Sequence, residues 1–148
     1  MNHSFHLVSL KDFGYEEYFK GVDRDGGVVI YHDHLRYLAD TLIWIETCDP
    51  FKQKPHRGLF WFGPTVIRTE GAAAVRVFQA WADLFKAGPE ILILLDHDYT
   101  FDEAHQMNFH PRLKVPRDDF VSKLSTLAAY AQQVIDSRGE FYILHLGI

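Results

Sequence analysis

The stretch from Gly58 to Asp98, GLFWFGPTVIRTEGAAAVRVFQAWADLFKAGPEILILLDHD, carries the clearest structural signals of the chain. Its aromatic and β-branched residues predict two short strands, at 59–62 and 65–68. The Gly63-Pro64 pair breaks the chain between these strands, as expected for a hairpin. An amphipathic helix is predicted next, from about Ala72 to Lys86, and Thr69 is expected to cap it.

The predicted helix and the apolar run after it indicate where the core lies. Apolar side chains recur along the helix three and four residues apart, at Ala74, Phe78, Trp81 and Phe85. Gly88 followed by Pro89 is a typical stop signal for a helix. The run from Ile91 to Leu95 is apolar at every position, so we expect it in the middle of a sheet with both faces covered.

Similar patterns predict the strands and helices of the rest of the chain. We expect an edge strand at 5–10, a strand at 28–31 and a final strand at 141–146 inside the sheet. Helices are expected from about His34 to Glu46 and between Pro116 and Gly139, while 51–57 is interpreted as a polar loop. Strands and helices alternate with hairpins mixed in. The prediction is therefore a single α+β domain over residues 1–148, with a mixed, largely antiparallel sheet and about three helices.

Composition narrows the classes of function. The chain has 148 residues, of which 47% are hydrophobic and 15% aromatic, so a single substantial core is expected. Its net charge of -5 argues against a nucleic-acid partner, because phosphate binding requires clustered lysine and arginine. An acidic balance suits a basic protein partner instead.

Cysteine content and the N-terminal residues suggest a compartment. Cys48 is the only cysteine, so no internal disulfide forms and a reducing cytoplasm is the simplest setting. The residues from Met1 to His6 do not resemble a signal peptide. The longest fully apolar run is far shorter than the roughly 20 residues of a membrane helix, so we expect no membrane association.

Two clusters of histidine and aspartate suggest metal binding. His32-Asp33-His34 lies where a strand meets a helix, and Asp96-His97-Asp98 follows the apolar run. One hypothesis is a small metal-dependent enzyme that uses His32, His34, Asp96, His97 and Asp98, because imidazole and carboxylate bind zinc, manganese or iron. The other interpretation is that they are polar residues at strand ends, with Asp33 as the helix cap, and that the chain holds no metal.

An acidic, aromatic segment is the candidate binding surface. Asp96, Asp98, Asp102 and Glu103 concentrate negative charge beside Tyr99, in the first part of the weakly patterned stretch 96–114. We expect these residues, with Asp23 and Asp25, to contact a basic partner. The alternative is an ordinary solvated loop.

Motifs for covalent catalysis and for cofactor binding do not support an enzyme. No serine lies in a Gly-x-Ser-x-Gly elbow, and no glycine pattern matches a phosphate-binding loop. A pair formed by Cys48 and a histidine stays open, although an inert thiol is the simpler interpretation. No cofactor is expected.

Several segments together resemble a known family. The chain resembles small immunity proteins of bacterial polymorphic toxin systems in four places. These are the sequence from Trp61 to Ile67, Glu70-Gly71-Ala72 at the start of a helix, Gly88-Pro89 before an apolar strand, and the closing residues Tyr142 to Ile148. The resemblance covers about the last 90 residues, by matching of periodic segments. It implies a cytoplasmic protein that neutralises a cognate toxin by binding to it.

Three hypotheses follow. The first is an immunity-type binding protein that occludes a toxin's basic cleft. The second is the metal-dependent enzyme. The third is a homo-oligomeric structural module, such as a homodimer, in which an aromatic face pairs with itself.

Overall fold

A six-stranded antiparallel sheet with two long helices on one face forms the body of the protein. The computed structural model describes residues 1–10, 26–94, 99–101, 104, 107–109 and 113–148. In the sheet the strands lie in the order β2 (Val28–Tyr31), β1 (Asn2–Ser9), β10 (Phe141–Leu146), β5 (Pro64–Ile67), β3 (Glu46–Asp49) and β4 (Lys54–Arg57). Each strand pairs antiparallel with its neighbour.

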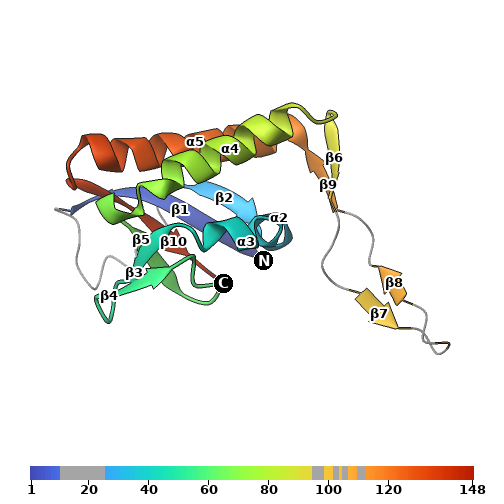
Figure 1. The fold of residues 1–148 in the computed structure, drawn as a ribbon, viewed down its shortest axis with the longest axis horizontal. Helices are drawn as coiled ribbons and strands as arrows, with labels where there is room; N and C mark the ends of the chain where they lie inside the picture. The colour runs from blue at the N-terminus through green and yellow to red at the C-terminus, as the bar shows by residue number, and fades with distance from the viewer. Residues whose placement is uncertain (11–25, 95–98, 102–103, 105–106, 110–112) are drawn as a thin grey trace.

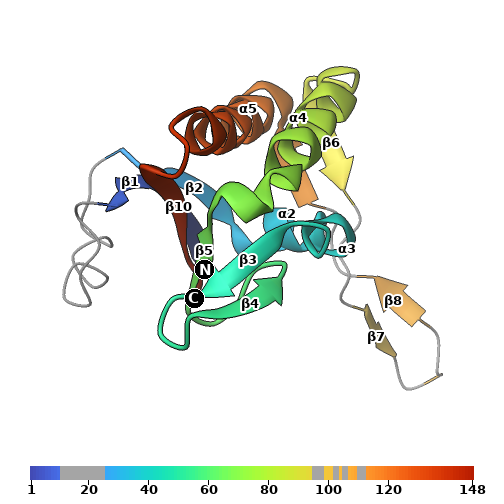
Figure 2. The same ribbon diagram turned by 60° about the vertical axis from the view of Figure 1, so that its left-hand side comes forward.

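Helices α4 (Ala73–Lys86) and α5 (Arg117–Asp136) lie side by side over one face of this sheet (Figures 1 and 2). Two short helices, α2 (His32–Arg36) and α3 (Ala39–Leu42), lie below α4 near one end of the sheet. The predicted α+β class, with a largely antiparallel sheet packed against helices, is confirmed. No helix in the described part of the chain is long and apolar enough to cross a membrane.

Strand alternation explains why the middle of the sheet is buried on both sides. Phe5, Ile67 and Ile143 face the helices and belong to the main core. On the opposite face Val66 and Leu144 form a second cluster with Val8 and Tyr142. Neighbouring residues of a strand point to opposite faces, so one apolar strand supplies both clusters.

The two ends of the described chain meet at the centre of the sheet. Strand β10 lies between β1 and β5, which confirms the prediction of an interior strand at 141–146. The prediction of an edge strand at 5–10 is wrong. β1 pairs with β10 over Ser4–Ser9 and with β2 over Asn2–Phe5, so its hydrogen bonds are shared between two neighbours.

The predicted helix at 34–46 is also wrong in extent. The chain forms α2 and α3 separated by a turn, and then enters β3 at Glu46. The four residues that suggested the helix are nevertheless all buried, namely Leu35, Leu38, Leu42 and Ile45. The predicted loop at 51–57 contains β4, because Lys54–Arg57 pairs with β3. Pairing between distant strands therefore overrides the local pattern here.

Within the stretch Gly58–Asp98 the outcomes differ. Residues 59–62 form no strand, whereas β5 occupies most of 65–68 and begins directly after Gly63, whose φ of 119° closes the turn. Helix α4 confirms the predicted helix. Thr69 does not cap it, because Thr69–Gly71 forms a separate 3-10 turn, η3, and no side chain of the described residues caps α4. The predicted helix between Pro116 and Gly139 is confirmed as α5.

The apolar run 91–95 does not lie inside the main sheet. Among the described strands, β6 (Ile91–Leu94) pairs only with β9 (Leu113–Pro116), and this two-stranded ribbon stands at the end of α4 and α5 (Figure 1). Leu92 and Leu94 face the core, while Ile91 and Ile93 are 45% and 47% exposed. The prediction that both faces are covered is wrong, because a fully apolar strand can also place half its side chains at the surface. Beyond the ribbon, β7 (Tyr99–Phe101) pairs with β8 (Met107–Phe109).

Candidate functional site

Three buried polar residues face the helices at one end of the main sheet. They are His3 on β1, His145 on β10 and Thr65 on β5, and all three are 0% exposed. Strands β10 and β5 place His145 directly opposite Thr65. His32 begins α2 immediately after β2, the strand that pairs with His3. The fold therefore collects side chains from four distant segments into one row.

The imidazole rings in this row are hydrogen-bonded in series. His145 Nδ1 lies 3.3 Å from Thr65 Oγ1, and His145 Nε2 lies 2.9 Å from His3 Nδ1. His3 Nε2 lies 2.8 Å from Nδ1 of His32. Adjacent ring planes differ by 10° and 13°, with centroids 5.1 Å apart, so the rings meet edge to edge rather than face to face. We call His145, His3 and His32 the imidazole line.

Aromatic side chains enclose the imidazole line. Trp61 packs nearly perpendicular to both His3 and His32, with centroids 5.5 Å away, and Phe5 lies 4.8 Å from His145. Burial, together with His32 and the amino group of Met1, lowers the pKa of His3 from 6.5 to about 4. Burial and the neighbouring His3 lower the pKa of His145 to about 3. Both rings are therefore neutral near pH 7, and each has one N–H donor and one acceptor nitrogen.

The spacing of the imidazole line indicates hydrogen bonds rather than metal ligation. A tetrahedral zinc ion bonds nitrogen at about 2 Å and so holds two ligand nitrogens about 3.3 Å apart. Here the facing nitrogens are 2.8 to 2.9 Å apart and the ring planes nearly coincide. Only a proton fits between them. Among the described residues, no three histidine, cysteine, aspartate or glutamate side chains gather in a way that would hold a metal ion.

The outer end of the imidazole line opens into a hollow of about 420 Å³. We call it the His32 hollow; its walls come from α2, α3 and the segment before β5, and include His32, Arg36, Tyr37, Asp40, Trp61 and Phe62. Phe62 is 79% exposed and stands at its edge. Nδ1 of His32 is occupied by His3, whereas its Nε2 makes no hydrogen bond to any residue that the structure describes.

His34, the partner of His32 in the metal hypothesis, turns away from the hollow. Its ring packs against Tyr31 and Phe120, with centroids 5.5 and 5.7 Å away. Burial, followed by the charge of Lys123, lowers the pKa of His34. Residues two apart on a helix point in nearly opposite directions, so the two histidines diverge. The other residues of that hypothesis, Asp96, His97 and Asp98, lie outside the described residues.

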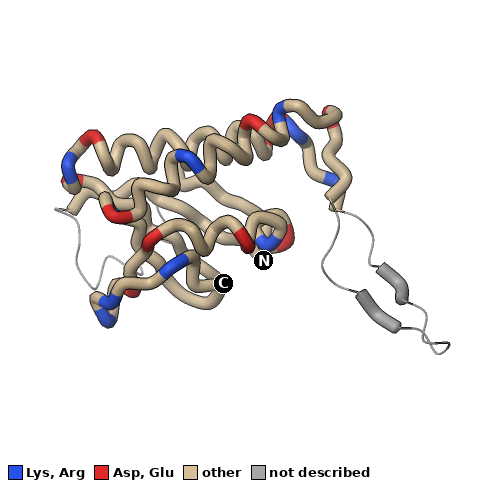
Figure 3. The backbone as a smooth tube through the Cα atoms, in the orientation of Figure 1, with Lys and Arg blue, Asp and Glu red and all other residues tan. Residues whose placement is uncertain are grey.

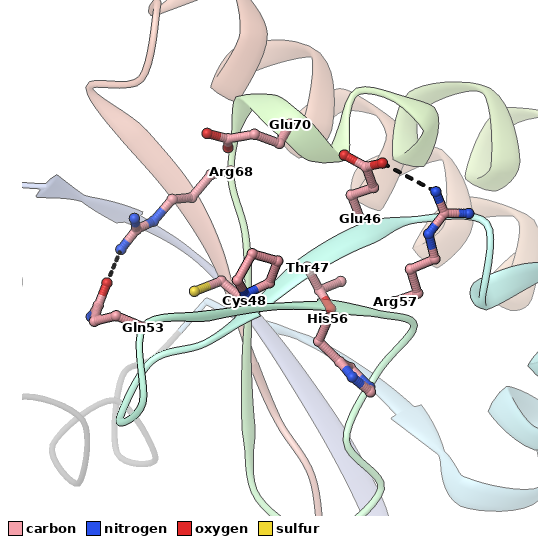
Figure 4. A pocket seen from close by; sticks show the side chains of 9 residues that line it. Glu46, Thr47, Cys48, Gln53, His56, Arg57, Arg68 and Glu70 are labelled. Carbon is pink, nitrogen blue, oxygen red and sulfur yellow. Dashed lines mark hydrogen bonds and ion pairs between the residues drawn. The ribbon is translucent and has the colours of Figure 1, made fainter.

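The lone cysteine lies in a second hollow, of about 550 Å³, beside β3 and β4 (Figure 4). Cys48 pairs with Pro55 in the strand register and Thr47 pairs with His56, so the thiol and the His56 ring lie on opposite faces. The His56 ring stacks on Phe60, at 4.2 Å and 12°. The strands therefore do not form a pair between Cys48 and His56. An exposed ion pair between Arg57 and Glu46, at 3.3 Å, lies at the edge of this hollow.

A third feature is an apolar groove between α3 and α4. We call it the Trp44 groove; it encloses about 480 Å³ between side chains that include Thr41, Trp44, Arg76, Val77, Trp81 and Leu84. Trp44 and Leu84 are each 61% exposed. Trp81 donates a hydrogen bond from Nε1 to Thr41 Oγ1 at 2.7 Å and stacks on Phe85 at 5.3 Å. Trp81 is thus held in a fixed orientation at the groove wall.

The residues predicted to bind a partner fall mostly beyond the described part of the chain. Asp23, Asp25, Asp96, Asp98, Asp102 and Glu103 lie outside it, and Tyr99 is placed only as the first residue of β7, opposite Phe109. The segments left out contain nine of the 20 carboxylates but four of the 15 lysines and arginines, which accounts for the whole net charge of -5. Over the described body the two signs are balanced and interspersed (Figure 3).

Sequence reasoning identified His32 but missed the rest of the imidazole line and the Trp44 groove. A usable signal was present, because His145 interrupts the apolar strand Phe141–Leu146 and a histidine in a central strand has to find a hydrogen-bond partner. The partner itself was not predictable, since His3 is 142 residues away. Comparison of the chain with protein-family models, with curated proteins and with solved structures finds no match.

Proposed function

We propose that this chain is a cytoplasmic binding protein of the immunity type, which covers the working surface of a bacterial toxin. The observation that carries the proposal is the Trp44 groove. Trp44 and Leu84 stand largely in solvent around one apolar hollow, and exposed apolar side chains that gather in this way are typical of an interaction site. Tryptophan and arginine are the side chains that most often dominate the energy of an interface, and Trp44 and Arg76 both line the groove.

One wall of the Trp44 groove is preorganised in the free protein. The indole of Trp81 is fixed by its hydrogen bond to Thr41 and by stacking on Phe85. A rigid wall loses little conformational entropy when a partner side chain packs on it, so more of the contact energy appears as affinity. An apolar side chain of the toxin, seated between Trp44 and Leu84, is the contact that this shape favours.

Charge supports a basic partner. The net charge of -5 is concentrated in the segments 11–25 and 95–112, which contain the predicted contacts Asp23, Asp25, Asp96, Asp98, Asp102 and Glu103. Concentrated negative charge accelerates encounter with a basic surface, and this effect weakens as salt is added. In the proposal these segments attract the toxin and the Trp44 groove holds it.

The test is calorimetric titration with the toxin domain that the neighbouring gene encodes. We expect a complex at or below micromolar concentration, and a loss of about 30-fold or more in affinity for Trp44→Ala, the scale of an interface hot spot. Phe51→Ala, which removes another exposed aromatic residue on the β3–β4 turn, is the matched control and is expected to change the affinity less than threefold.

Other outcomes identify the competing hypotheses. No complex with any neighbouring or secreted toxin at micromolar concentration would contradict the immunity-type function. A dimer in light scattering that Trp44→Ala disrupts would instead favour the homo-oligomeric module, with the groove as its interface. Stoichiometric metal after purification without a histidine tag would favour the metal-dependent enzyme.

A further inference from the structure

The buried end of the imidazole line determines where its protons lie. The hydroxyl oxygen of Thr65 accepts a hydrogen bond from the backbone N–H of Phe60 at 2.8 Å. Its own proton then needs an acceptor, and His145 Nδ1 is the one acceptor within hydrogen-bond distance among the described residues. A fully buried hydroxyl that donates to nothing is costly. Thr65 therefore donates to His145 Nδ1, which has to be the unprotonated nitrogen.

The unprotonated Nδ1 of His145 fixes the donor and acceptor nitrogens of His3 and His32 as well. A neutral imidazole that accepts at Nδ1 carries its proton on Nε2, so His145 donates to His3 Nδ1 at 2.9 Å. His3 in turn donates from Nε2 to His32 Nδ1 at 2.8 Å. His32, which accepts this hydrogen bond at Nδ1, carries its proton on Nε2 and presents an Nε2–H donor. Reversing every bond would satisfy the three rings equally well but would leave the proton of Thr65 without an acceptor.

His32 lines a hollow whose walls also include the flat aromatic rings of Trp61 and Phe62. Trp61 packs edge-to-face on the His32 ring at 77°, which, with the bond to His3, restricts rotation of the imidazole. The neighbouring side chain, Phe62, is almost fully in solvent. Together these rings form an apolar platform with one directed N–H group, and the combination is typical of small-molecule sites.

We propose that the His32 hollow binds a planar ligand that carries a carbonyl-type oxygen, an aromatic amide or an aromatic carboxylate. The oxygen accepts the hydrogen bond from His32 Nε2, and the ring of the ligand packs against Trp61 and Phe62. Arg36 and Asp40 also line the hollow and carry opposite charges, so the lining does not favour a neutral amide over a carboxylate. The binding experiment below distinguishes the two. This site is independent of the Trp44 groove and does not rest on the proposed toxin partner.

The proton positions are tested first, on protein labelled with ¹⁵N at histidine. Long-range proton–nitrogen correlation spectra distinguish the two neutral tautomers of each ring. We expect protonated Nε2 and unprotonated Nδ1 for His145, His3 and His32 at pH 7.5. A proton on Nδ1 of His32 would overturn the proposal.

Binding is tested by adding benzamide or benzoate while the His32 and Trp61 side-chain resonances are followed. Benzylamine, which has the ring but no oxygen acceptor, is the control ligand. We expect saturable shifts at millimolar concentration with at least one of the two oxygen-bearing probes, and none with benzylamine. Their relative affinities then show whether the amide or the carboxylate is preferred. Absence of any shift, or equal binding of benzylamine, would overturn the proposal.

Two variants locate the site. Phe62→Ala removes an exposed side chain, so the protein should fold normally, and we expect at least fivefold weaker binding of the preferred probe. His32→Phe keeps an aromatic ring but removes the donor, and should abolish binding, whereas His34→Phe, on the same helix but facing away, should bind normally. If Phe62→Ala bound as tightly as the unaltered protein, the hollow would not be the site, whatever the stability of His32→Phe.

Discussion

At the scale of single residues, Thr65 supports two hydrogen bonds in the core. Its hydroxyl accepts from the N–H of Phe60 and faces Nδ1 of His145. Thr65→Val keeps the volume of the side chain but leaves both groups buried without a partner. We expect it to lower the free energy of unfolding by about 2 to 4 kcal/mol, measured by urea denaturation. Thr126→Val, which removes a hydroxyl from the exposed face of α5, is the control and should cost about 0.5 kcal/mol or less. Equal effects of the two changes would show that the buried hydroxyl contributes no more than the exposed one.

The same residues predict how stability depends on pH. The folded protein lowers the pKa of His3 from 6.5 to about 4 and that of His145 to about 3. Below pH 6.5 the unfolded chain therefore binds protons that the folded protein excludes. The free energy of unfolding is therefore highest above pH 6.5. It decreases by about 1.4 kcal/mol per pH unit for each ring as the pH falls, down to about pH 4 for His3 and about pH 3 for His145.

Urea denaturation at pH 7, 6 and 5 measures this loss. The variant His56→Gln, which removes an exposed histidine, should show the same decline between pH 7 and 5 as the unaltered protein. A free energy of unfolding that stays constant from pH 7 to 5 would mean that the folded protein binds protons on these rings as readily as the unfolded chain does, which would contradict the lowered pKa values of His3 and His145.

Residue burial was easier to predict from the sequence than residue contacts. The spacing of Leu35, Leu38, Leu42 and Ile45 correctly marks four core positions, although the helix assigned to them is broken. The sites predicted from the sequence were based on the triplets His32-Asp33-His34 and Asp96-His97-Asp98. The imidazole line also requires His3 and His145, which lie on β1 and β10. Local pattern shows that a side chain is buried, but it does not show which distant strand will supply its hydrogen-bond partner.

At the scale of elements, the β6–β9 ribbon has one structural face and one exposed face. Leu92 and Leu94 belong to the main core, while Ile91 and Ile93 project into solvent. We expect Leu92→Ala to lower the free energy of unfolding by about 2 to 4 kcal/mol and Ile93→Ala by less than about 1 kcal/mol, measured by urea denaturation. Equal losses would indicate that both faces are covered, as the sequence first suggested.

The elements that were predicted well are those whose signals are local. Helices α4 and α5 have long apolar stripes and clear ends, and β10 is apolar and aromatic enough to be recognised as interior. Strands β3 and β4 were missed. Their sequences, Glu46–Asp49 and Lys54–Arg57, are polar and become strands because β5 offers an open edge to pair with.

At the scale of the whole molecule, the sheet joins segments from opposite ends of the described chain. β1 and β10 pair across more than 130 residues, and β10 also carries His145. Contacts of such long range form only when most of the chain has been ordered, so they belong to the cooperative unit of folding. The imidazole line is therefore built by global folding rather than by any one element.

Amide hydrogen exchange tests this arrangement across the molecule. We expect the amides of β1, β10 and β5 that are hydrogen-bonded within the sheet to exchange only through global unfolding, with exchange free energies equal to the free energy of unfolding from urea denaturation. The amides of β4, an edge strand, and of the β6–β9 ribbon should exchange through smaller openings, since each of these strands has a described partner on only one side. Because His145 lies on β10 and His3 on β1, opening of the imidazole line should then require unfolding of the whole domain. Protection of β10 no greater than that of β4 would mean instead that the line opens locally, and the pH dependence of stability would be weaker than predicted.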